Sequence, residues 1–116
     1  MNISAYAVVL DCGNAGKLAQ FWSEVLGRPV DPDPSEEFAS IDAGRSAALS
    51  LVFAKVPEAK AGKNRVHLDL TVATLDDEVE RVIAAGAREA GRFEEDGSRW
   101  VTLTDPDGNE FDLVAG

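Results

Sequence analysis

The sequence predicts an α+β fold of two tandem βαβββ modules, whose curled, mostly antiparallel sheet surrounds a cleft. Short apolar strand-like stretches alternate with amphipathic helical stretches. This strand-helix-strand order occurs twice, and Ala7 aligns with His67, 60 residues later. At 116 residues the chain has the length of one domain. We therefore expect a single domain over 1–116, with module one at about 1–57 and module two at about 64–116.

The first module is predicted to open with the strand "SAYAVVLDC". A helix should follow from Ala15 to Leu26, because apolar residues recur there at helical spacing. Asn14 suits the N-cap and Gly27 suits the C-terminal stop. Two short strands, "FASID" and "ALSLVF", are separated by the turn-forming "AGRS". The first half therefore reads as strand, helix and strands.

The second module repeats this order with the strand "VHLDLTV" and a helix from Leu75 to Ala85. Thr74 and Asp77 resemble a capping box at its start, and Gly86 should end it. Its apolar stripe is expected to reach Ile83. The remaining strands are expected within "GAREAGRFEE", "RWVTLT" and "EFDLV", the last two joined by the turn "DPDGN".

The strands also predict which residues face the cleft, because side chains alternate across a strand. The apolar rows should pack on the helices, Val66, Leu68 and Leu70 among them, and the complementary rows should face the cleft. One alternative is that this second face is simply solvated, as in many antiparallel sheets. Trp100 argues against it, because a large aromatic residue stands in a row that would otherwise be polar. The predicted cleft residues are Ala7, Val9, Ser50, Val52, His67, Asp69, Trp100, Thr102 and Asp112.

Composition excludes several classes of function. The formal net charge of -10 disfavours nucleic-acid binding, because the phosphate backbone would be repelled. No apolar run approaches the ~20 residues that a membrane span needs. The N-terminus lacks the features of a signal peptide, so a cytoplasmic protein is expected. The single cysteine, Cys12, is expected to be a buried thiol rather than a nucleophile.

Three stretches resemble the glyoxalase, bleomycin-resistance and extradiol-dioxygenase superfamily, also called the vicinal oxygen chelate proteins. They are "AVVLDCGNAGKLAQFWSEVLG", "VHLDLTVATLDDEVERVIAAGA" and "LTDPDGNEFDLV". Their order extends the likeness over the whole chain, and it is strongest to the small glyoxalase-like domain proteins. The resemblance implies the paired-module fold and a small-molecule ligand.

The resemblance also implies where a metal would bind, because metal-dependent members place a ligand on the first and last strand of each module. Those positions here are Ala7, Ser50, His67 and Asp112. Alanine cannot be a ligand and neutral serine is a poor one, so only His67 and Asp112 remain as weak candidates. We therefore expect no tightly bound metal and no cofactor, with a divalent metal as the alternative.

The expected function is small-molecule binding, with a degenerate metal site and a drug- or metabolite-sequestering role. The alternative is a lyase, isomerase or dioxygenase-type enzyme that uses His67 as a base or a weakly held metal. A third possibility is a scaffold domain with a vestigial cleft. A homodimer is also expected, because Trp22 and the wide helix stripe exceed what one small sheet must cover.

Overall fold

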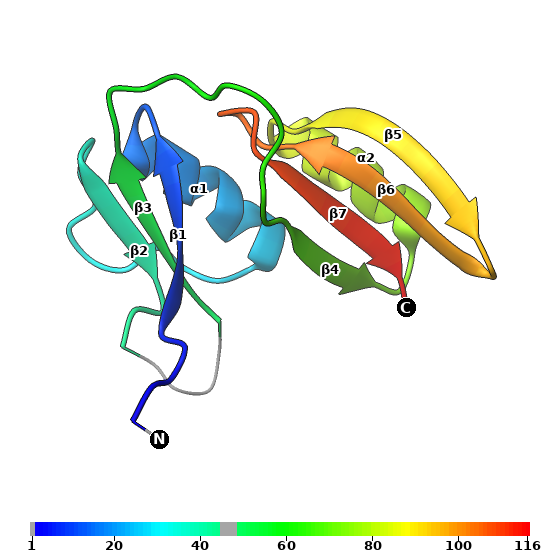
Figure 1. The fold of residues 1–116 in the computed structure, drawn as a ribbon, viewed down its shortest axis with the longest axis horizontal. Helices are drawn as coiled ribbons and strands as arrows, with labels where there is room; N and C mark the ends of the chain where they lie inside the picture. The colour runs from blue at the N-terminus through cyan, green and yellow to red at the C-terminus, as the bar shows by residue number, and fades with distance from the viewer. Residues whose placement is uncertain (1, 45–48) are drawn as a thin grey trace. The chain divides into compact units, whose positions relative to one another are not determined.

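The computed structural model describes residues 2–44 and 49–116. The chain divides into two compact units, Met1–Ala59 and Lys60–Gly116. Each unit combines one helix with a sheet of its own (Figure 1). The predicted α+β class and the two-module organisation are therefore confirmed. The second half of the predicted turn "AGRS" and the first residue of "ALSLVF" fall on residues 45–48, outside the described residues.

The first unit contains β1 (Ala7–Cys12), α1 (Ala15–Leu26), β2 (Phe38–Ile41) and β3 (Ser50–Lys55). Its sheet has the order β1-β3-β2. β3 is parallel to β1 and antiparallel to β2. Among the described residues this unit therefore has three strands, one fewer than the predicted βαβββ order.

The second unit contains β4 (Leu68–Val72), α2 (Leu75–Ala85), β5 (Arg88–Glu95), β6 (Ser98–Thr104) and β7 (Glu110–Ala115). Its sheet has the order β4-β7-β6-β5, and the unit has the full βαβββ order. β4 pairs with β7 in parallel, whereas the other two pairings are antiparallel. Both sheets are thus mixed, because the opening and closing strands of each unit run in the same direction.

The two helices have the predicted bounds but differ at their caps. The side chain of Asn14 accepts a 3.1 Å hydrogen bond from the Lys17 amide, and Gly27 ends α1 with a left-handed φ of 66°. Thr74 makes no side-chain cap bond to α2, so the predicted capping box is wrong. The first turn of α2 instead carries three acidic residues, Asp76, Asp77 and Glu78. Their negative charges stabilise the helix, because they lie at the positive end of its dipole.

The strand parity expected from the sequence agrees with the burial in the second unit. Val101 and Leu103 of β6 are buried on the side of α2, as are Phe111 and Leu113 of β7. The face away from α2 is called the outer face below, and it carries the alternate residues of each strand. Ile83 is 41% exposed, so the apolar stripe of α2 is narrower than predicted.

Two residues near strand ends differ from the predicted burial. Val66 was expected to pack inward, but it precedes β4 and is 76% exposed. Ser50 lies in the predicted row, on the same face as Val52, but it is fully buried, and its hydroxyl donates a 2.7 Å hydrogen bond to the carbonyl of Asp42. No described helix is both long and apolar enough to cross a membrane.

Candidate functional site

A cluster of one imidazole and two carboxylates lies on the outer face of the second unit. The Nε2 atom of His67 lies 3.3 Å from Oδ1 of Asp69 and 3.3 Å from Oδ2 of Asp112. The side chain of Asp112 is 13% exposed, whereas those of His67 and Asp69 are 42% and 60% exposed. The cluster is therefore open to solvent at one side and anchored to the sheet at the other.

His67 precedes β4, and contacts of the preceding segment explain its position. The backbone amide of Asn64 donates a 3.0 Å hydrogen bond to Oε1 of Glu110, at the start of β7. The Lys60 ammonium lies 3.2 Å from the same oxygen. Partial burial alone would raise the pKa of Glu110, but the amides of Asn64 and Glu110 and the Lys60 ammonium together lower it. An ionised Glu110 thus fixes the segment that leads into His67.

Asp112 is oriented by the neighbouring strand. Thr102 of β6 lies opposite Asp112 in the strand register, and its hydroxyl donates a 2.6 Å hydrogen bond to Oδ1. The other carboxylate oxygen is left to face His67. The structure thus brings together four of the predicted cleft residues: His67, Asp69, Thr102 and Asp112.

An aromatic pair extends the same face. Phe93 of β5 lies opposite Trp100 of β6, and their rings stack with centroids 5.5 Å apart and planes 19° from parallel. Trp100 lies on the outer face, as predicted, while Phe93 was not predicted. The dipeptide Asp96-Gly97 could have predicted the position of Phe93, because a two-residue turn of this type fixes which residues of a hairpin lie opposite each other. Both turn residues have positive φ, and that register pairs Phe93 with Trp100.

The remaining predicted residues lie in the first unit and are described there. Ala7 lies opposite Ser50, and Val9 lies opposite Val52, so the four share one face of their sheet. Val9 is exposed, but the hydroxyl of Ser50 is buried and bonded to Asp42. This face offers apolar contacts and no free hydroxyl at Ser50.

The strand register corrects the predicted equivalence of the two modules. It places Ala7 opposite Ser50, but it places Asp69, not His67, opposite Asp112. A shift of two residues keeps a side chain on the same face of a strand. His67 and Asp69 therefore both point toward Asp112, and the second unit holds one more candidate ligand than the sequence predicted.

The donor set can be tested against the metal that the superfamily implies. Ala7 provides no donor and Ser50 uses its hydroxyl for Asp42, so a four-ligand site that includes them does not fit. Ligand atoms of His67, Asp69 and Asp112 lie within 4.8 Å of one another. One imidazole and two carboxylates are suitable donors for a divalent ion, and three protein ligands are typical of catalytic zinc. A three-ligand site within the second unit therefore fits.

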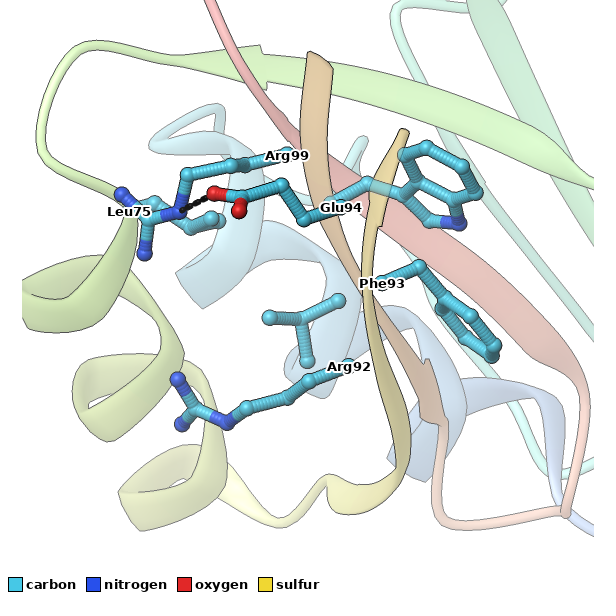
Figure 2. Close-up of a pocket in the computed structure, with 7 residues that line it drawn as sticks. Leu75, Arg92, Phe93, Glu94 and Arg99 are labelled. Atoms are coloured by element: carbon cyan, nitrogen blue, oxygen red, sulfur yellow. Dashed lines mark ion pairs between the residues drawn. The ribbon is translucent and has the colours of Figure 1, made fainter. Parts of the chain in front are cut away.

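A separate pocket lies beside the hairpin of β5 and β6. Figure 2 shows Arg92 and Arg99 extending toward the helix, whereas Phe93 points to the other side of the strands. Both arginines form ion pairs with Asp76, at 3.1 Å and 3.5 Å. The pocket is thus lined by paired charges and is distinct from the His67 cluster. Its lining residues are Leu75, Arg92, Phe93, Glu94, Arg99, Trp100 and Val101.

Comparison with solved structures shows the same fold in several bacterial proteins. A glyoxalase/bleomycin resistance protein/dioxygenase family enzyme from Burkholderia phytofirmans is 21% identical, with a TM-score of 0.77 over 95% of this chain and 96% of that chain. A glyoxalase-related enzyme from Fulvimarina pelagi is 17% identical, with a TM-score of 0.74 over 97% and 88%.

A third similar structure is a mutant of the fosfomycin resistance protein FosX from Listeria monocytogenes, solved with Mn(II) and 1S,2S-dihydroxypropylphosphonic acid. It is 16% identical, with a TM-score of 0.80 over 100% of this chain and 92% of that chain. A search of curated protein sequences found no match. The glyoxalase-like domain family matches residues 7–114. Its match spans nearly the whole chain, so this protein belongs to the glyoxalase-like domain family.

Proposed function

We propose that the protein binds a small organic molecule, in a drug- or metabolite-sequestering role, on the outer face of the second unit. The observation that carries this proposal is the stack of Phe93 on Trp100 beside the His67 cluster. Phe93 is 48% exposed, although large aromatic side chains contribute most when they are covered. A ligand that covers the pair would bury apolar surface, and the cluster would orient its polar group.

The predicted cleft extends this proposal to the first unit. Within the first unit, Ala7, Val9, Ser50 and Val52 would form an apolar ligand-binding surface of their own. The alternation of side chains along the strands supports this extension, because the sheet of each unit has one face that its helix does not cover.

A library of metabolites and antibiotics, screened by thermal shift with and without divalent metals, tests the proposal. A hit should raise the midpoint of unfolding of the wild type, because a ligand that binds only the folded state stabilises it. The same compound should leave the midpoint of Trp100→Ala unchanged. Arg99→Ala is a matched control, since Arg99 is the neighbouring residue on the other side of β6, and it should respond like the wild type. Equal shifts for the wild type and Trp100→Ala would place the ligand elsewhere.

A second candidate function is an enzyme that acts on a small metabolite, favoured by the convergence of His67, Asp69 and Asp112. These residues would hold a divalent ion, which supplies Lewis-acid chemistry or an activated water when bound. Without a metal, His67 could accept a proton, with Asp112 holding the ring in place.

Elemental analysis of protein purified without a histidine tag, followed by calorimetric titration with zinc, nickel and manganese, separates the two functions. One equivalent of co-purifying metal that His67→Ala removes would favour the enzyme. Sequestration alone predicts no bound metal after purification and a ligand that is recovered chemically unchanged.

A further inference from the structure

One glycine of the second unit stands inside a strand where its backbone does not require glycine. Gly91 belongs to β5, the strand at one edge of its sheet. It does not have a positive φ, whereas Gly97 in the adjoining turn has a φ of 81°. Glycine inside a strand loses conformational entropy and offers no side chain to pack, and it often marks the close approach of another group. Such an approach would account for Gly91.

The ring of Phe93 fills the space that a side chain at position 91 would need. A Cβ atom added to Gly91 would lie 2.9 Å from Cζ and 3.0 Å from Cε2 of Phe93. Carbon atoms in contact are normally about 3.5–4.0 Å apart. The Phe93 side chain therefore bends back along its own strand, so that the far end of its ring lies over Gly91. Another residue at position 91 would displace the ring.

A β-bulge lies directly before these two residues. The register between β5 and β6 shifts between Glu89 and Gly91, so Ala90 is the extra residue. A bulge increases the local twist of a strand and redirects the side chains near it. The bulge and the glycine thus act at the same point of β5, where the ring of Phe93 lies down over the strand and stacks on Trp100.

The strand register puts the end of this ring in line with two carboxylates. Gly91 lies opposite Thr102 of β6, and Thr102 lies opposite Asp112 of β7. Asp112 in turn lies opposite Asp69 of β4. These four positions form one row across the outer face, with neighbouring strands about 4.8 Å apart. The end of the Phe93 ring takes the empty side-chain position of this row, one strand away from Thr102.

We propose that Gly91 is a positioning residue of the ligand-binding face and makes this face selective for flat rings. Because Gly91 has no side chain, Phe93 lies over the strand and stacks on Trp100, and the two rings form one platform beside Thr102. A flat ring covers such a platform, whereas a puckered ring of the same size makes fewer atomic contacts with it. This inference rests on the proposed function and names the shape of its ligand.

Gly91→Ala tests the position of the ring in the absence of a ligand. The added Cβ atom should move Phe93 away from Trp100, so the indole N–H signal of Trp100 should shift in nitrogen-proton spectra. The signal of the buried Trp22, in the first unit, should stay in place. The midpoint of thermal unfolding should change little, because the stabilising effect of alanine at an unstrained position offsets the lost stack.

A matched control adds one atom at the neighbouring residue instead. Ala90→Ser changes the exposed residue that has no partner in the register of β6. It should leave the Trp100 signal close to its wild-type position. A shift as large as that of Gly91→Ala would show that any change in β5 disturbs Trp100, and it would overturn the specific role of Gly91.

Phenol and cyclohexanol test the selectivity, because they carry the same hydroxyl on a flat ring and on a puckered ring. Titrations followed at the Trp100 signal should give phenol a roughly two- to tenfold higher affinity, as expected of an aromatic stack. Gly91→Ala should lose this preference. In the background of Phe93→Ala, the same substitution should have no further effect on phenol binding, because Gly91 acts through Phe93.

The outcomes distinguish this inference from the proposed function. An unmoved Trp100 signal in Gly91→Ala, or an unfolded variant, would overturn the positioning role, and equal affinities for phenol and cyclohexanol would overturn the selectivity. A hit of the thermal-shift library that needs Trp100 but binds Gly91→Ala as tightly as the wild type would overturn the inference and leave the proposed function in place. If neither these compounds nor any library member binds, the proposed function falls and this inference falls with it.

Discussion

Phe93 stacks on Trp100 across the hairpin of β5 and β6, with ring planes 19° apart. Both residues lie on the face that turns away from α2, so the pair is a surface feature of its sheet rather than part of the core. The opposite side of β6 holds Val101 and Leu103, which are buried. This contrast within one strand allows binding and stability to be separated by mutation.

Replacing Trp100 with Ala should leave the fold intact. We expect a loss of ~0.5–1.5 kcal/mol for the aromatic pair, in addition to a modest contribution from buried area. Leu103→Ala, on the core side of the same strand, should cost ~2–5 kcal/mol. Urea unfolding of the two variants measures both values. A loss for Trp100→Ala as large as that for Leu103→Ala would mean that Trp100 belongs to the core.

Replacing Thr102 with Val should destabilise the protein by roughly 1.5–3 kcal/mol, because Oδ1 of Asp112 loses its hydrogen-bond donor. The substitution preserves shape and removes the hydroxyl. Thr104→Val, the next residue of β6 on the same face, serves as control and should change the free energy of unfolding much less. Equal effects of the two substitutions would show that the bond to Asp112 contributes nothing measurable.

Glu110 should make the stability of the second unit depend on pH. Its folded pKa is lowered, mainly because the hydrogen bonds from two amides and the Lys60 ammonium outweigh the effect of partial burial. Its contribution is therefore complete above the unfolded pKa of ~4.3 and is lost as the pH falls through the lower folded pKa.

Glu110→Gln should accordingly be less stable than the wild type at neutral pH. The difference between the two proteins should shrink as the pH is lowered through the acidic range, because the wild-type carboxylate becomes protonated and the glutamine does not titrate. Chemical denaturation at a series of pH values checks this expectation. A difference that is independent of pH would show that the charge of Glu110 is unimportant.

The homodimer expected from the sequence stays a prediction, with one of its reasons removed. Trp22 is 1% exposed and contacts Phe21 edge to face, so it does not supply the apolar surface that was expected at an interface. Light scattering at several protein concentrations tests the prediction. A mass near 12.3 kDa at every concentration would contradict it.

The local pattern of residues was sufficient for both helices, for most strands and for the face on which Trp100, Thr102 and Asp112 lie. Such features depend on contacts between residues close in sequence: an N-cap at Asn14, a stop at Gly27, and alternation along β6. The Asp96-Gly97 turn also determines the register that pairs Phe93 with Trp100. That pairing was not predicted, because apolar and polar residues alternate only weakly along β5.

Other features depended on pairing between distant strands. Alignment of the two halves equated Ala7 with His67, but the register between β4 and β7 set Asp69 opposite Asp112 and so added a third donor to the cluster. The burial of Ser50 depended on a hydrogen bond to Asp42, and the position of His67 depended on the contacts that Glu110 makes with Asn64 and Lys60. Residue spacing fixes which face a side chain occupies, whereas the register of parallel strands fixes which side chains meet. That register is set by the packing of the whole sheet on its helix.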